Sequence, residues 1–331
     1  MIIDTHVHLA GTGSSSGCRL SSRLRRGPAF WYIRFLSRQM LVPVTDESIR
    51  EHLLAVLSAS KLVDRAVFLA LDMPHDAGGQ ARPEWSHLFV PNDYCAAIAE
   101  RETKVLFGAS VHPARPDALD ELDRVAEMGA VLVKWLPSSQ AIDPADPAHK
   151  PFYAKLAELK LPLLCHVGPE HAIPPAGVTR AQRRTVLAWN DPAVLHQPLE
   201  AGVTVIAAHC ALPIYPWEPS RYEVLRDLME RFPNCRADIS ALFLPMQRRL
   251  KLVKRVLDEL DQERLLLGSD YPLPVSCRMP RGLKPADPAE RRAARAEKNT
   301  LDRNVRMARA MGFKECVLHN ASRVLRLSWP A

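Results

Sequence analysis

The amino-acid sequence predicts an α/β fold, a distorted eight-stranded barrel in a single domain, and two patterns support this. First, eight short apolar runs of the length of a buried strand are spread along the chain. Second, amphipathic helical patterns separate these runs, which is typical of parallel strands joined by crossover helices. A count of eight favours a closed (β/α)8 barrel, the TIM-barrel architecture, over an open sheet. Because no linker divides the chain, residues 1–331 are expected to form one domain.

The predicted elements follow one another in a regular order. Strands are expected at residues 4–8, 63–71, 105–111, 130–136, 161–167, 203–209, 235–239 and 264–270. Helices are expected at residues 49–57, 92–101, 117–128, 147–159, 221–231 and 245–260, with another beginning at Pro192. Thr45 and Asp191 are suitable capping residues for two of these helices. Residues 281–296 are interpreted as a loop entering a final helical region, which closes with an amphipathic helix over residues 315–327.

A long segment separates the first strand from the first predicted helix. Residues 11–17 are rich in Gly and Ser, and the segment up to residue 44 carries six arginines around Phe30, Trp31 and Tyr32. Excursions of this length are uncommon in compact domains unless they form lids or binding loops. Residues 11–44 are therefore a candidate active-site cover. An amphipathic segment with a solvated arginine face is favoured over a nucleic-acid-binding patch.

Composition and charge narrow the class of protein. The formal net charge is +7, but 37 acidic residues are interspersed among 44 basic ones, so no nucleic-acid partner is expected. The seven cysteines form no Cys-x-x-Cys pair and resemble reduced thiols. No run approaches the roughly 20 apolar residues of a membrane span, and the first strand leaves no room for a targeting segment. A cytoplasmic protein without a membrane partner is expected.

Polar side chains stand where several predicted strands end. The set comprises His6 and His8 on the first strand, Lys134 on the fourth, His166 on the fifth, His209 on the sixth and Asp270 on the eighth. The carboxyl ends of barrel strands meet at one mouth, which is where barrel enzymes carry their active sites. The sequence thus predicts a cluster of histidines and carboxylate at that mouth.

Four motifs, in this order, resemble those of the amidohydrolase superfamily. The similarity is strongest to its amidohydrolase-related branch, which contains aminocarboxymuconate-semialdehyde decarboxylase and related lactonases and hydrolases. The motifs are Asp4-Thr5-His6-Val7-His8, Leu164-Cys165-His166-Val167-Gly168, Ala208-His209-Cys210 and Gly268-Ser269-Asp270-Tyr271-Pro272. Residues 320–325 also resemble the usual ending of that branch, so the resemblance spans nearly the whole chain.

The resemblance implies a metal-dependent barrel enzyme. It assigns one divalent metal to His6, His8, His166 and Asp270, and it makes His209 the proton-transfer group beside a metal-activated water. Asp270 is also a candidate proton acceptor. Three imidazoles and a carboxylate suit Zn²⁺, which we expect, and also suit Mn²⁺, Fe²⁺ or Co²⁺.

Five further residues are candidates for substrate binding. Lys134 is expected to pair with a substrate carboxylate; in some superfamily members a carboxylated lysine on this strand bridges two metals, although this branch usually lacks it. His112 either contacts the substrate or caps a turn before Pro113. Trp135 and Tyr271 are candidates for the pocket wall. Arg278 is a candidate for receiving an anionic substrate.

The expected reaction is hydrolysis of an amide, lactone or related carbonyl compound by a metal-activated water. The alternative is a metal-dependent, non-oxidative decarboxylation of an unsaturated or aromatic carboxylic acid in the same site. A non-catalytic ligand-binding barrel is the third interpretation, and the complete set of polar residues argues against it. The expected partner is a small molecule, and a homo-oligomer remains open.

Overall fold

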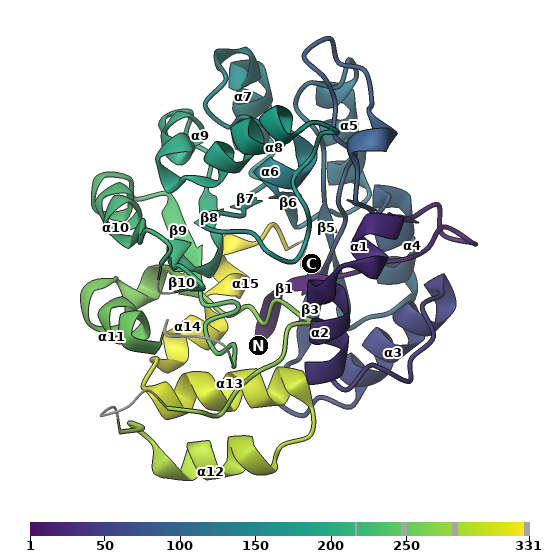
Figure 1. The fold of residues 1–331 in the computed structure, drawn as a ribbon. Coiled ribbons are helices and arrows are strands. Elements are labelled where there is room, and N and C mark those ends of the chain that lie inside the picture. Colours follow the sequence, from purple (N-terminus) through teal and green to yellow (C-terminus); the bar gives the residue numbers. More distant parts are fainter. Residues whose placement is uncertain (216, 246–249, 280–283, 328–331) are drawn as a thin grey trace.

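A parallel barrel forms the centre of the computed structural model, which describes residues 1–215, 217–245, 250–279 and 284–327 (Figure 1). Neighbouring strands follow the order β1-β3-β5-β6-β7-β8-β9-β10. Their bounds are Ile3–His8, Arg65–Leu69, Val105–Ala109, Leu132–Trp135, Leu163–Cys165, Val205–Ala207, Cys235–Asp238 and Leu265–Leu266. The predicted eight-stranded barrel is confirmed.

Backbone hydrogen bonds between the first strand and the segment after β10 close the barrel. The Thr5 N–H donates to the Leu267 carbonyl at 3.0 Å, and the His8 N–H donates to the Tyr271 carbonyl at 2.9 Å. Val7 and Tyr271 also form a parallel bridge. These bonds bring the first and eighth strands of the barrel together.

Helices surround the barrel, and two more lie in the insertion after β1. The insertion contains α1 Ser22–Arg26 and α2 Pro28–Leu36. The other helices are α3 Asp46–Ser58, α4 Asn92–Arg101, α5 Ala118–Glu127, α6 Pro137–Gln140, α7 Lys150–Glu158, α8 Arg180–Leu187, α9 His196–Glu200, α10 Tyr222–Arg231, α11 Leu250–Glu259, α12 Pro288–Ala296, α13 Thr300–Met311, α14 Glu315–His319 and α15 Ala321–Val324. The expected Thr45 cap is present, because its side chain and that of Ser48 form a capping box for α3.

Two hydrophobic layers result from the alternation of side chains along each strand. The inner layer fills one end of the barrel and includes Ile3, Val67, Leu69, Leu106, Leu132, Leu164, Ile206 and Leu266, with Leu325 packed against them. The outer layer, between strands and helices, includes Val7, Phe68 and Trp135. The inner layer leaves the opposite end of the barrel, where the strands end, to polar side chains.

Several predicted element boundaries need correction. Residues 315–327 form two short helices, α14 and α15, because the Asn320 side chain turns the chain by donating to the Gln262 and Leu265 carbonyls, both at 2.9 Å. Residues 288–296 are helix rather than loop, since Asp287 caps the start of α12. The chain from Pro192 forms a short 3-10 turn before α9. Residues 246–249 and 281–283, part of two other predictions, lie outside the described residues.

The first part of the insertion is fixed by contacts with a short strand and with the start of α3. β2 Arg19–Leu20 pairs with β4 Leu88–Phe89 in a small antiparallel sheet. The Asp46 carboxylate accepts backbone N–H groups of Gly13, Ser15 and Ser16 at 2.8–3.0 Å. These contacts fix the glycine- and serine-rich loop against the start of α3.

None of the seven cysteines forms a disulfide within the described part of the chain. Among the described residues, no helix combines the length and the apolar character that crossing a bilayer requires.

Candidate metal centre

A bulge in β1 aims both histidines of the first motif into the barrel. The pairing of β1 with β3 shifts register between Asp4 and Val7. Without such a shift, Ile3 and Val7 would face the same side, yet Ile3 lies in the inner layer and Val7 in the outer one. The shift turns His6 and His8 inward, where their Nε2 atoms are 3.2 Å apart.

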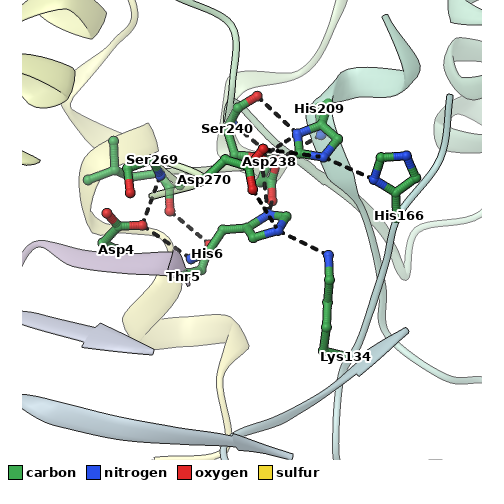
Figure 2. Close-up of polar contacts among 12 residues, drawn as sticks. Asp4, Thr5, His6, Lys134, His166, His209, Asp238, Ser240, Ser269 and Asp270 are labelled. Atoms are coloured by element: carbon green, nitrogen blue, oxygen red, sulfur yellow. Dashed lines mark hydrogen bonds and ion pairs between the residues drawn. The ribbon is translucent and has the colours of Figure 1, made fainter. Parts of the chain in front are cut away.

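Asp238 at the end of β9 orients His6 (Figure 2). The His6 Nδ1 atom is 2.8 Å from the Asp238 Oδ2 atom, and both side chains are inaccessible to solvent. Burial opposes ionisation of Asp238, but His6 and other hydrogen-bond donors outweigh it and hold the pKa of this carboxyl below its usual range. An anionic Asp238 requires the proton of neutral His6 on Nδ1, so the Nε2 lone pair is left facing the site.

His209 belongs to a tight turn that follows β8. His209, Cys210 and Ala211 have φ values of 59°, 49° and 51°, a left-handed conformation that non-glycine residues rarely adopt. The Asp238 Oδ1 atom accepts the His209 N–H at 2.8 Å. The His209 Nδ1 atom is 3.2 Å from the Ser240 carbonyl, which can only accept, so Nδ1 carries the proton. Its Nε2 lone pair therefore faces the same space as that of His6.

Asp270 completes the group from the segment after β10. Its φ is 59°, and its N–H donates to the His6 carbonyl at 2.9 Å. Its Oδ1 atom lies 3.4 Å from His6 Nε2 and 3.1 Å from His8 Nε2, and Oδ2 lies 3.9 Å from His209 Nε2. Burial opposes its ionisation, but the imidazoles of His209 and His6 outweigh this and hold the pKa of Asp270 well below its usual range.

His166 extends the cluster from the residue after β7. Its Nδ1 atom is 3.2 Å from the His209 Nε2 atom. Its other ring nitrogen, Nε2, is buried without a hydrogen-bond partner among the described residues. Burial lowers the pKa of His166 to about 3, so the imidazole is neutral at pH 7 and has a lone pair to offer.

These residues fit a divalent transition metal. Ligand atoms of His6, His209 and Asp270 all lie within 4.8 Å of one another. His8 and His166 stand at the edge of this group, at the distances given above. A site for Zn²⁺ or Mn²⁺ typically combines imidazoles whose tautomers are set by a second hydrogen-bond partner with an anionic carboxylate. An unpartnered buried ring nitrogen is a further indication of such a site. The compact group includes His209, for which the sequence predicted proton transfer.

Lys134 lies beneath the cluster. Its side chain is inaccessible to solvent, and its Nζ atom is 3.0 Å from His6 Nε2. Burial lowers the pKa of this amine. Lys134 does not border the cavity described next, so it contacts the histidine cluster rather than the space available to a substrate.

A cavity of about 710 Å³ opens above the cluster. His8, His166, His209 and Asp270 form its floor. The insertion forms much of its wall, including Leu24, Phe30, Ile33, Leu36 and Val42. Tyr271 also borders the cavity, and its hydroxyl accepts a hydrogen bond from the Gln39 side chain of the insertion at 2.8 Å. Apolar side chains predominate in the wall.

Besides Lys134, three predicted substrate contacts do not border this cavity. Trp135 is fully buried in the outer layer, where it stacks on Phe152, because strand alternation points it away from the inward-facing Lys134. His112 is buried and caps a turn, with Nδ1 accepting the Ala114 N–H at 3.1 Å. Arg278 is exposed to solvent. These three side chains therefore do not line the cavity, and His112 takes the turn-capping role that the sequence left open.

The sequence interpretation missed Asp238 and Ser240. Ser240 Oγ lies 2.8 Å from His209 Nδ1 and 3.1 Å from His6 Nδ1, so it touches both imidazoles from behind. The signal was present in the sequence, since Asp238 lies near the end of a predicted seventh strand and Ser240 directly follows that strand. That strand is short and has a partly exposed arginine in its middle, which made its end look unremarkable.

The fold and the site together define a barrel protein with a metal-capable cluster of histidines and carboxylate at the carboxyl ends of its strands. The amidohydrolase family profile matches residues 3–325, and the chain therefore belongs to this family, whose members are metal-dependent enzymes. The comparison with curated proteins finds no significant match.

Solved structures share the fold over nearly the whole length. A 5-carboxyvanillate decarboxylase from Sphingomonas paucimobilis is 15% identical, with 99% of each chain covered and a TM-score of 0.58. A putative 2-pyrone-4,6-dicarboxylic acid hydrolase from Pseudomonas putida is 15% identical, with 98% of this chain and 94% of that chain covered and a TM-score of 0.55. A manganese-bound dihydroxybenzoic acid decarboxylase from Polaromonas is 15% identical, with 98% and 96% covered and a TM-score of 0.54. Hydrolases and decarboxylases thus share this fold.

Proposed function

We propose that this protein is a metal-dependent hydrolase that attacks an amide, lactone or related carbonyl group with an activated water. One observation carries the proposal: three imidazoles and one carboxylate form the floor of a cavity large enough for a small organic substrate, and a fourth imidazole, that of His6, lies directly behind them. His6, His8, His166 and Asp270 are the proposed ligands of one divalent metal, with Zn²⁺ first and Mn²⁺, Fe²⁺ or Co²⁺ as alternatives. His209 and Asp270 are the proposed catalytic residues.

A divalent ion bound here supplies Lewis acidity and lowers the pKa of water toward neutrality. The protein's own contribution is orientation and proton transfer. Asp238 holds His6 with its Nε2 lone pair toward the cluster. The Ser240 carbonyl holds His209 with an unprotonated Nε2 at the cavity floor, where it can accept a proton from water and return it to the leaving group.

The cavity wall supports a substrate with an apolar or aromatic body. Arg34 is the one guanidinium that borders the cavity among the described residues, and it already donates to the Met40 and Val42 carbonyls at 3.3 and 2.5 Å. A small dianion would therefore find a single guanidinium there, whose Nη2 group is already engaged by two carbonyls, although its Nε is buried without a hydrogen-bond partner among the described residues. We infer that the reacting carbonyl lies at the metal and that the rest of the substrate packs on apolar side chains.

The insertion is the proposed cover of this site. Its side chains contribute to the cavity wall, and the hydrogen bond from Gln39 to Tyr271 joins it to the segment that carries Asp270. A cover of this kind excludes water from the reacting groups when substrate is bound.

The test is an assay of the metal-loaded enzyme against matched esters, lactones and amides whose apolar body grows stepwise. The proposal expects incorporation of oxygen-18 from labelled water into the acid product, with kcat/KM rising with apolar size until the cavity is full. Absence of turnover and of labelled product across the whole panel would contradict it.

Decarboxylation is the second candidate, and the apolar cavity wall is the observation that favours it. A carboxylate loses its charge when it leaves as carbon dioxide, so surroundings that solvate the charge poorly favour the reaction. Release of carbon dioxide from aromatic carboxylic acids, without incorporation of labelled oxygen into an acid product, would assign this reaction instead.

A further inference from the structure

The outer surface of the insertion combines positive charge with exposed apolar side chains. Residues 5–45 contain no Asp or Glu, whereas they contain six arginines. Arg23, Arg25, Arg26 and Arg38 are exposed. Trp31, Tyr32, Phe35, Met40 and Leu41 are large apolar or aromatic side chains exposed on the same short segment. We call these nine residues the insertion surface.

The geometry of α2 turns Trp31 and Phe35 of this surface away from the cavity. Phe30 and Ile33 point to the cavity, while Trp31 and Phe35, four residues apart, share the exposed face of the helix. Phe35 is 67% exposed. Neither Trp31 nor Phe35 borders the cavity, so their exposed faces do not contribute to the space for a substrate.

A buried arginine holds the following turn in place. The Arg34 guanidinium donates to the Met40 and Val42 carbonyls and lies 5.8 Å from the centre of the Trp31 ring. These contacts fold the chain after α2 back on the helix. Leu41 is thereby left 96% exposed at the tip of the turn, beside the aromatic face. Exposing an apolar side chain to water at this tip is unfavourable, and no packing contact within the described residues offsets the unfavourable free energy.

We propose that the insertion surface binds an anionic lipid bilayer peripherally, with Trp31, Phe35 and Leu41 entering the interface and the arginines meeting lipid phosphates. Basic and aromatic side chains on one amphipathic segment are typical of interfacial binding. This departs from the sequence-based expectation of no membrane partner, which considered membrane spans. It is independent of the reaction that the site performs.

The side chains of the insertion surface fit a second copy of this chain or a nucleic acid less well than a lipid bilayer. In a symmetric contact with a second copy, the same surface would face itself and bring like arginines together. Nucleic acid would satisfy the arginines and stack on Trp31, but it offers no apolar contact to Leu41 or Met40. A lipid interface satisfies both kinds of side chain.

The insertion surface lies next to the cavity, which links membrane binding to access of a substrate. Tyr32 is exposed and also borders the cavity, so the insertion surface and the cavity wall meet at that residue. A substrate with an apolar body that partitions into the bilayer would therefore be concentrated next to the cavity.

The experiment is flotation of the metal-loaded full-length protein with phosphatidylcholine vesicles, with and without phosphatidylglycerol. We compare the wild type with the variant R23Q/R25Q/R26Q and with the variant F35S/L41S, neither of which alters a cavity or cluster residue. The matched control is R292Q/R295Q/K298Q, which removes three exposed charges from α12 and the residues just after it. Circular dichroism and metal content verify that each variant is folded.

The wild type and the control should float with phosphatidylglycerol vesicles, with binding weakened by added salt. The triple arginine variant should partition roughly 100-fold less, since each arginine near an anionic surface contributes about a 5-fold effect. F35S/L41S should partition at least roughly tenfold less. No binding by the wild type would overturn the proposal, as would unchanged binding by F35S/L41S. Two other outcomes would also overturn the proposal, because they assign the surface to a different partner. The first is a wild-type dimer that the F35S/L41S substitutions dissociate, and the second is retention of the wild type on a single-stranded oligonucleotide as strong as its binding to the vesicles.

Discussion

The Nδ1 atom of His6 lies 2.8 Å from the Oδ2 atom of Asp238, and neither side chain meets solvent. The same carboxylate accepts the backbone N–H of His209 through its other oxygen at 2.8 Å. One buried aspartate thus positions two members of the cluster. Such partners behind a metal ligand set its tautomer and raise its basicity.

Replacing Asp238 with Asn should therefore weaken metal binding by 10- to 100-fold. The carboxamide keeps the shape but loses the negative charge that stabilises the proton on His6 Nδ1. Competition with a metal-binding dye measures the affinity, and D120N, which changes an exposed aspartate of α5, is the control. Equal affinity of D238N and the wild type would count against this role.

His209→Asn should keep the metal and lower kcat by roughly 10²- to 10⁴-fold, because it removes the proposed proton acceptor. The variant distinguishes two roles, since His209 Nε2 also lies within reach of the ligand group. Metal content and kcat are measured on the same preparation. Loss of the metal would make His209 a ligand and contradict its assignment to proton transfer.

The folded protein should become less stable as the pH decreases, and part of this loss should come from His87, which contacts the insertion. Its Nδ1 atom is 2.9 Å from Ser21 Oγ. Burial, helped by the nearby charge of Arg23, lowers the pKa of His87 to about 4. Because this value lies below the unfolded value of about 6.5, folding favours the neutral form. The contribution to stability is full above pH 6.5 and is lost as the pH falls from 6.5 toward 4.

A comparison of His87→Gln with the wild type isolates this effect. Glutamine keeps a polar side chain but does not titrate. The melting temperature of the variant should therefore decrease less between pH 7 and pH 5 than that of the wild type. Differential scanning fluorimetry measures both. H319Q, which removes an exposed histidine from α14, should follow the wild type. Parallel pH dependence of H87Q and the wild type would refute the assignment.

The hydrogen bond between Gln39 and Tyr271 should hold the insertion over the cavity. Tyr271→Phe removes the acceptor but keeps the ring. A bond worth about 1 kcal/mol corresponds to roughly fivefold more opening, and amide hydrogen exchange in residues 19–42 should accelerate accordingly. Tyr32→Phe removes an exposed hydroxyl from the insertion and is the control. Identical exchange in Y271F and Y32F would show that this bond does not restrain the insertion.

Much of the fold could be predicted because its signals are local. Apolar runs alternate with amphipathic helices, and residues such as Thr45 begin helices through their own side chains. The failures arose where a distant contact decides. Asn320 breaks the predicted closing helix by bonding to carbonyls near residue 262, more than 50 positions away, and no local pattern reports that bond.

The site was predicted in part for the same reason. His6, His8, His166, His209 and Asp270 could be found because they end strands of a barrel, and the structure places them together. Trp135 and His112 also stand at strand ends, but their placement depends on which face of the barrel each side chain takes. Strand alternation decides this for Trp135, as the bulge in β1 decides it for His6 and His8, and a one-residue change in register reverses the face that a side chain takes.

Metal analysis tests the central claim most directly. Wild-type protein purified without chelator, D120N and D270A would be analysed by inductively coupled plasma mass spectrometry. The wild type and D120N should each retain about one equivalent of a transition metal per chain, and folded D270A should retain much less. Folded, metal-free wild-type protein that takes up no Zn²⁺ or Mn²⁺ at a stoichiometric dose would contradict the account.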